Sequence, residues 1–248
     1  RRQGKSLITG QDYAPIYDHP DVRLMLAVMK AKVEAARAIC MLTASAIDAV
    51  KLGEDAERHK RREDFLVPIA KAWSTDRAVE VASAGVQVHG GMGFIEETGA
   101  AQYYRDARIA PIYEGTNGIQ AADLVGRKLG NDGTAAKELE VDIKAFVDSN
   151  LPAAFKADCE ALKSALNVFS AATDHLLMQK SAAPLDVTTA ATTYLTICGD
   201  LIGGWLLLKG AIAAHGQLES GDTVWLTDRI KLMCIFFAHN LRHAPAHL

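Results

Sequence analysis

The sequence predicts an all-α protein made of two helical bundles that follow one another along the chain. Apolar residues recur every three or four positions over long stretches, and no segment alternates in the two-residue rhythm of a strand. Proline and glycine are few and cluster between these stretches. A chain of 248 residues, 49% of them hydrophobic, can bury the core of one large domain or two ordinary ones.

The first bundle is predicted to contain two long helices. The first starts after Pro20 and runs to about Leu52, with Ala31, Ala35 and Ile39 among its inward positions. The other predicted elements are a helix at about 62–88, a glycine-rich break at 90–93, a short helix at 100–105, a loop at 111–116 and a helix to about 129. The two long helices are long enough for an antiparallel bundle.

The turn residues at 130–134 have no apolar anchor and mark the predicted boundary between two domains, 1–131 and 132–248. Four further helices are predicted at 135–149, 152–181, 186–215 and 222–243, which together form a small bundle. The most apolar stretch, 190–208, is interrupted by Asp200. We therefore expect a buried core helix there and no membrane span.

Charge and cysteine usage exclude some classes of function. The net charge of −3 argues against a strongly basic nucleic-acid-binding protein, so we predict no nucleic-acid partner. The four cysteines lie far apart in apolar helical stretches, which indicates reduced, buried thiols of an intracellular protein, and we predict a cytoplasmic location. His239 and His243 lack a third ligand, so no metal site is predicted. The chain starts Arg1-Arg2 without a Met, which we interpret as truncation of a longer protein.

Chemistry-bearing residues concentrate between 87 and 120. Glycines at 90, 91 and 93 follow a predicted helix. One glycine would be enough to end that helix, whereas three within four residues would also let a phosphate or a flat ring approach the backbone. Both interpretations stay open on the residues alone.

Glu114 precedes a helix for which Thr116 is a suitable N-cap. A glutamate near a helix start is favoured by the helix dipole, which is a purely structural explanation. Its neighbours Ile109, Ile112 and Tyr113 could instead partly desolvate the carboxylate, which suits proton abstraction from carbon. The charges of 105–108 are interpreted as an ion-pair network that fixes a loop.

These segments resemble the C-terminal signature of the acyl-CoA dehydrogenase family in order and spacing. The matching residues are Gln87, Gly90, Gly91, Gly93, Phe94, Arg105, Asp106, Ala107, Ile109, Tyr113, Glu114, Gly115, Thr116, Ile119 and Gln120. The resemblance covers about residues 1–130 and implies the four-helix C-terminal domain of that family. The tail resembles, more weakly, the extra helical domain of longer members, among which 3-methylmercaptopropionyl-CoA dehydrogenases look most similar.

The resemblance implies α,β-dehydrogenation of an acyl-CoA thioester, with Glu114 as the base for the α-proton and Tyr113 and Gly115 beside the substrate. The backbone N–H of Glu114 would hydrogen-bond the thioester carbonyl. The implied electron acceptor is an electron-transfer flavoprotein.

The resemblance also implies FAD as the cofactor, which would take up the hydride. It places Gln87, Gly90 and Gly91 against the FAD of a neighbouring subunit, so a homo-oligomer is expected. Thr116 and Asn117 align with residues that touch the flavin nucleotide, and Arg1 with an FAD-contacting arginine. The Phe-Gly that usually follows this arginine is replaced by Gln3-Gly4, and Arg2 is a possible substitute.

Two other functions remain open at this stage. One is an acyl-CoA oxidase of the same superfamily, which passes electrons to oxygen. The other is a non-enzymatic helical module for oligomerisation or nucleic-acid association, against which the acidic net charge and Glu114 both argue. Because the domains that cover the flavin are absent, we expect this chain alone to bind FAD poorly and to turn over no substrate.

Overall fold

The computed structural model describes residues 1–53, 55–130 and 132–241, and over these residues it contains helices and no strand. The α-helices are α1 Pro20–Leu52, α2 Ala56–His89, α3 Gly91–Phe94, α4 Ala100–Ala107, α5 Asn117–Asp123, α6 Thr134–Val147, α7 Lys156–Gln179, α8 Pro184–His215 and α9 Thr223–His239. Short 3-10 turns lie at Ile16–Asp18, Glu96–Thr98 and Ala153–Phe155, and a π-helical turn at Leu124–Lys128. The predicted all-α class is confirmed.

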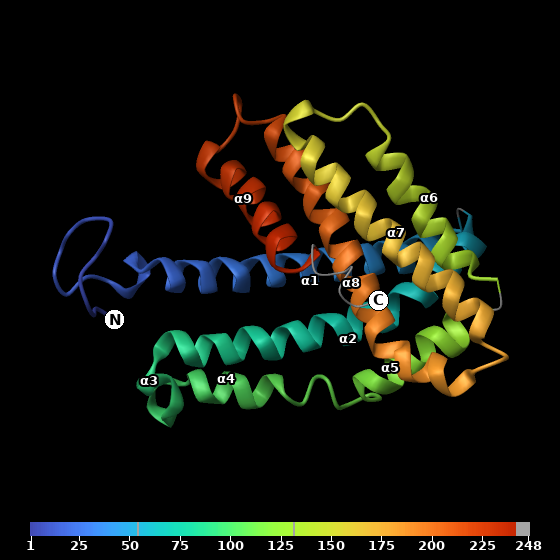
Figure 1. The fold of residues 1–248 in the computed structure, drawn as a ribbon, viewed down its shortest axis with the longest axis horizontal. Coiled ribbons are helices and arrows are strands. Elements are labelled where there is room, and N and C mark those ends of the chain that lie inside the picture. Colours follow the sequence, from blue (N-terminus) through green and yellow to red (C-terminus); the bar gives the residue numbers. More distant parts are fainter. Residues whose placement is uncertain (54, 131, 242–248) are drawn as a thin grey trace.

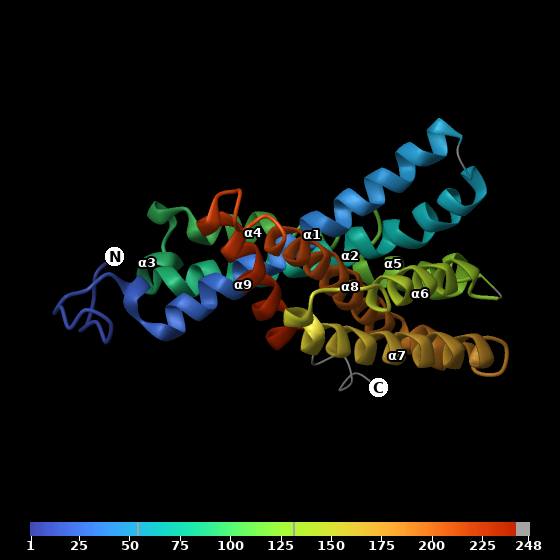
Figure 2. The same cartoon turned by 90° about the horizontal axis from the view of Figure 1, so that it is seen from above.

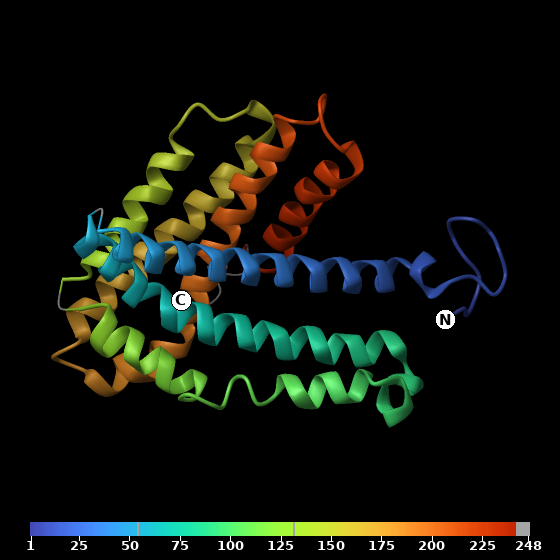
Figure 3. The ribbon, with the colours of Figure 1, turned by 180° about the vertical axis from the view of Figure 1, so that it is seen from behind.

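The long helices α1 and α2 run antiparallel and form the spine of the molecule (Figure 1). α4 and α5 lie along α2 on the side away from α1, joined by an extended loop (Figures 1 and 3). α6 to α9 form a second layer on this spine, with α6 toward the end where α1 meets α2 and α9 beside the N-terminal half of α1 (Figures 1 and 2). The N-terminal loop lies at the opposite end, beside α3.

A single hydrophobic core runs through both predicted bundles. It joins Ile39 of α1 and Trp73 of α2 to Cys198 of α8 and Phe236 of α9, all of them buried. The second bundle therefore does not bury its apolar faces by itself, but packs them on the first. The predicted division at residues 131 and 132 stays a prediction, and Asn131 lies outside the described residues.

α8 is the one helix in the described part of the chain that is long and apolar enough to cross a membrane. Most of its apolar window is buried within the protein, where it packs against α1, α5, α7 and α9. The carboxylate of Asp200, which is 3% exposed, accepts a hydrogen bond of 3.0 Å from the indole N–H of Trp73. These contacts are those of a core helix.

Helix boundaries follow the predictions with one notable difference. α1 ends at Leu52, and Gly53 has the left-handed backbone (φ 79°) that terminates a helix. α2 begins at Ala56, earlier than predicted from the apolar pattern. Its first turns are charged because they face the acidic side of α6: Arg58 pairs with Asp142 at 2.9 Å. The spacing of apolar residues cannot predict where a helix begins when its first turns are stabilised by ion pairs with a distant segment. The last helix ends at His239, four residues before its predicted end at 243, which itself lies outside the described residues.

The prediction of four buried cysteines is wrong for two of them. Cys159 and Cys198 are buried, whereas Cys40 and Cys234 are exposed, and none of the four is in a disulfide. Cys40 and Cys234 lie on the outer faces of α1 and α9, where an apolar sequence context does not guarantee burial.

Thiol labelling should separate these two pairs. Burial raises the pKa of Cys159 and of Cys198, so both access and thiolate formation are disfavoured there. With an aromatic disulfide reagent at mildly alkaline pH, we expect fast labelling of Cys40 and Cys234 in the native protein. All four thiols should react in denaturant. Fast native labelling at Cys198 would contradict the packing of α8.

Candidate active site

Glu114 lies on a strained loop between α4 and α5. Its φ of 54° and the φ of 85° at Gly115 place two successive residues in the left-handed region. A non-glycine residue with such a φ is uncommon and persists only where the surroundings fix it. Tyr113, Glu114 and Gly115 are all exposed in this chain, so the strained loop presents them at the surface.

Hydrogen bonds from two helices hold this loop. The side-chain amide of Gln120 on α5 donates to the carbonyl of Glu114 at 3.1 Å. The ammonium of Lys71 on α2 donates to the carbonyl of Gly115 at 2.8 Å. Thr116 caps α5, its hydroxyl accepting from the N–H of Ile119 at 3.4 Å, which confirms the predicted cap.

Asn117 ties the start of α5 to α2. Its side-chain N–H groups donate to Asp76 at 2.7 Å and to the carbonyl of Ala72 at 3.0 Å, with Thr75 also in range at 3.0 Å. Its side-chain oxygen accepts from Lys71 at 2.8 Å. The amide is thus fully engaged within the chain. Its predicted contact with the flavin nucleotide stays a prediction. The hydrogen bonds to α2 show that Asn117 also holds the start of α5 against α2.

The expected desolvation of Glu114 by its own neighbours is not found. Ile109 is 57% exposed, Ile112 48% and Tyr113 53%. These side chains are themselves largely exposed, as Glu114 is, so they do not bury the carboxylate. Exposed apolar side chains close to a carboxylate in the sequence are typical of a surface that another domain or a ligand covers.

Arg105 forms an ion pair, as predicted, although with a partner outside the segment that suggested it. Its guanidinium donates to both carboxylate oxygens of Glu96, at 3.0 and 2.7 Å. The pair joins α4 to the turn before it and therefore fixes that turn. Both side chains are exposed, so the pair contributes little to stability.

A second cluster brings Arg1 next to the glycine-rich break. Gly90 ends α2 with a φ of 64°, and a Cβ built on it would lie 2.5 Å from the guanidinium of Arg1. A Cβ on Gly91 would meet no atom within 4 Å, whereas one on Gly93 would lie 2.3 Å from the carbonyl of Val86. Internal packing thus explains Gly93 and the helix end explains Gly90. Gly91 leaves the backbone open beside a cation, and Gln87 is exposed one turn earlier.

The structure does not bring the two clusters together. Lys71, which holds the Glu114 loop, and Gly90 are 19 residues apart along α2. At the rise of an α-helix this is about 28 Å. Glu114 and the Arg1–Gly90 cluster therefore cannot face the same reacting atoms within one chain.

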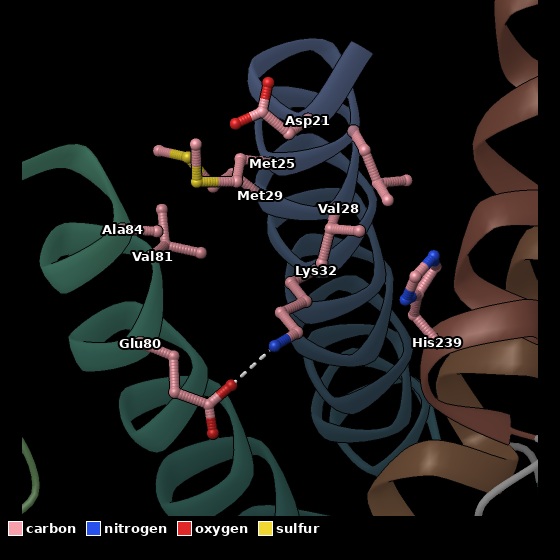
Figure 4. Close-up of a pocket in the computed structure, with 10 residues that line it drawn as sticks. Asp21, Met25, Val28, Met29, Lys32, Glu80, Val81, Ala84 and His239 are labelled. Atoms are coloured by element: carbon pink, nitrogen blue, oxygen red, sulfur yellow. Dashed lines mark hydrogen bonds and ion pairs between the residues drawn. The ribbon is translucent and has the colours of Figure 1, made fainter. Parts of the chain in front are cut away.

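An apolar groove of about 360 Å³ lies between α1 and α2. In Figure 4, Met25 and Met29 of α1 point toward Val81 and Ala84 of α2, and an ion pair of 2.7 Å between Lys32 and Glu80 closes one end. No residue predicted to bind cofactor or substrate lines this groove. Among the described residues no group of three His, Cys, Asp or Glu side chains could hold a metal ion, and His243 lies outside them.

Comparison with known proteins accounts for both halves of the chain. Residues 8–129 match the family described as acyl-CoA dehydrogenase, C-terminal domain, and residues 139–248 the family described as acetyl-CoA dehydrogenase C-terminal like. The 3-methylmercaptopropionyl-CoA dehydrogenase of Ruegeria pomeroyi is 43% identical over 92% of this chain. The chain belongs to the acyl-CoA dehydrogenase family. It spans 40% of the length of that relative.

Solved structures of longer proteins contain the fold of this chain. Caenorhabditis elegans ACDH-11, in complex with C11-CoA, superposes on 95% of this chain with a TM-score of 0.72 at 20% identity, and the chain covers 38% of it. An acyl-CoA dehydrogenase of Bacillus anthracis, complexed with FAD, superposes on 98% with a TM-score of 0.70 at 17% identity, and the chain covers 43% of it. At these identities the likeness concerns the fold.

The family motif led to Glu114 and its loop, but sequence reasoning missed the residues of α2 that hold it. Lys71 and Thr75 lie four residues apart, hence on one face of α2, and Asp76 follows them. A lysine next to the buried Ile69, Ala72 and Trp73 was the available signal, since a cation in an apolar stretch needs a partner.

Proposed function

We propose that the chain is the C-terminal portion of an FAD-dependent acyl-CoA dehydrogenase and that Glu114 removes the α-proton of the acyl-CoA thioester. The observation that supports this most strongly is the presentation of Glu114. Its backbone is held in a rare conformation by hydrogen bonds from two helices, while its side chain stays exposed and follows two exposed apolar side chains, Ile112 and Tyr113, in the sequence. A base for a C–H bond needs such positioning in a site from which a ligand can exclude water.

The backbone beside the base supports the same role. Within the part of the chain that the structure describes, the N–H of Glu114 donates to no protein acceptor. It can therefore donate to the thioester carbonyl and stabilise the negative charge that develops there as the α-proton leaves. Tyr113 and Gly115, on either side, would line the substrate.

The residues near Gly90 fit a cofactor phosphate. Arg1 supplies a positive charge, and Gly91 leaves its backbone accessible. FAD, when bound, would accept the β-hydrogen as hydride. Gln87, Gly90, Gly91 and Arg1 would hold one FAD, and Thr116 and Asn117 would lie near the flavin nucleotide that serves Glu114.

The separation of about 28 Å between the two clusters, at the rise of an α-helix, supports a homo-oligomer. The Gly90 cluster of one subunit would bind the FAD that serves the base of its neighbour. We also propose a cytoplasmic location and an electron-transfer flavoprotein as the electron acceptor.

A substrate panel tests the proposed function. The FAD-loaded enzyme that carries this chain should convert saturated acyl-CoA thioesters, 3-methylmercaptopropionyl-CoA among them, into the trans-2-enoyl-CoA. The product is identified by mass and absorbance. Reoxidation should need an electron-transfer flavoprotein or an artificial acceptor. Stoichiometric hydrogen peroxide in air would indicate an oxidase. Bound FAD without any enoyl-CoA would favour the non-enzymatic helical module and contradict the proposal.

A further inference from the structure

Lys71 is placed to control the geometry of the Glu114 loop. Its ammonium, half-buried on α2, donates to the carbonyl of Gly115 and to the side-chain oxygen of Asn117, both at 2.8 Å. It thus connects the residue after Glu114 to the first residue of α5. These two partners are 44 and 46 residues away in the sequence, so the contact fixes the loop relative to the spine of the protein.

We propose that Lys71 is a positioning residue for the base, an inference that rests on the proposed function of Glu114. The left-handed backbone of Glu114 needs external bonds to persist, whereas Gly115 adopts such a φ without strain. Gln120 holds the carbonyl of Glu114 from α5, and Lys71 holds the next carbonyl from α2. The hydrogen bonds of Lys71 go to the Gly115 carbonyl and the Asn117 side chain, so it would act through the loop that carries the base.

Asn117 adds further contacts between the start of α5 and α2. With its oxygen on Lys71, the N–H groups of its amide face Asp76 and the backbone of α2. The ammonium therefore also helps orient this amide. Removing the Lys71 ammonium would release the Gly115 carbonyl and take one bond from the side-chain oxygen of Asn117, which would keep its bonds to Asp76 and Ala72. Thr116 would still cap α5. The expected defect is confined to the loop.

The first experiment needs only this chain. We compare backbone amide hydrogen exchange in the wild type, Lys71→Met and Lys71→Arg. A matched control is Lys180→Met, because Lys180 is equally half-buried and donates at 2.6 Å to the carbonyl of Gly130, in a different loop. We expect Lys71→Met to speed exchange of the two amides of the segment 113–119 that donate to backbone carbonyls, those of Tyr113 and Asn117, about tenfold or more, with α8 unchanged. Lys71→Arg should restore part of the protection, and Lys180→Met should leave residues 113–119 unchanged. Equal exchange in wild type and Lys71→Met overturns the proposal.

The second experiment uses the FAD-loaded enzyme that carries this chain. Misplacement of the base by about 1 Å should lower kcat for acyl-CoA by about 10²-fold in Lys71→Met. KM should change much less than kcat, because the position of the base matters most in the transition state, in which it takes the α-proton. Lys71→Arg should recover part of kcat, and Lys180→Met should match the wild type. An unchanged kcat overturns the positioning role. If the wild type itself oxidises no acyl-CoA, the proposed function fails, whereas hydrogen exchange still decides whether Lys71 fixes the loop.

Discussion

Gly199→Ala is expected to destabilise the protein by about 3 kcal/mol, because it forces a methyl group into a filled core. A Cβ at Gly199 of α8 would lie 2.2 Å from Cδ1 of Trp73. Trp73 is 1% exposed and donates from its indole N–H to Asp200, so it cannot turn away without losing a buried hydrogen bond. Urea unfolding followed by circular dichroism measures the change.

Gly210→Ala is the matched control in the same helix. A Cβ at Gly210 would meet no atom within 4 Å, and its α-helical backbone suits alanine. We expect a gain in stability of up to about 1 kcal/mol. Two variants that destabilise the protein equally would show that the loss is not specific to the contact between α8 and Trp73. A Gly199→Ala variant as stable as the wild type would contradict the shared core.

Glu114→Gln is expected to lower turnover of acyl-CoA by about 10²–10⁴-fold, the usual contribution of a general base. Glutamine keeps the size of the side chain and leaves the backbone N–H of Glu114 available to the thioester carbonyl. Binding of acyl-CoA should therefore change little. Steady-state kinetics and a ligand titration on the FAD-loaded enzyme separate the two effects.

Glu97→Gln provides the control for Glu114→Gln. Glu97 is an exposed carboxylate on the turn before α4, and its loss removes the same charge from the same side of α2. It should leave turnover unchanged. Equal losses in both variants would assign the effect to net charge, and a Glu114→Gln enzyme with wild-type turnover would place the base elsewhere.

Long amphipathic patterns predicted the helices well, because burial of one face determines them. α1 appears where Ala31, Ala35 and Ile39 repeat, and each of these is buried. The start of α2 was missed because its stabilising partners are charges on α6, far away in the sequence. The shared core was missed for a similar reason: a helix pattern shows which face is apolar, but not which helix covers it.

The candidate site divides in the same way. Local sequence predicted the cap at Thr116, because a cap depends on neighbours within a few residues. The role of Glu114 as the base stays a prediction. Local apolar side chains did not predict the surroundings of the carboxylate, since Ile112 and Tyr113 point outward in the fold. Lys71 was missed because its contact with Gly115 depends on how α2 and α5 pack together. The spacing of residues along the sequence does not predict that packing.

Anaerobic reduction of the bound flavin by acyl-CoA, with the wild-type enzyme and Glu114→Gln side by side, is the decisive test of the proposed reaction. We expect rapid bleaching of the flavin spectrum in the wild type. Glu114→Gln should bind the same acyl-CoA and keep its oxidised spectrum over the same time. Equal bleaching in both enzymes would contradict the role of Glu114. No bleaching in an FAD-loaded wild type, with every acyl-CoA of the panel, would contradict the assignment as a dehydrogenase.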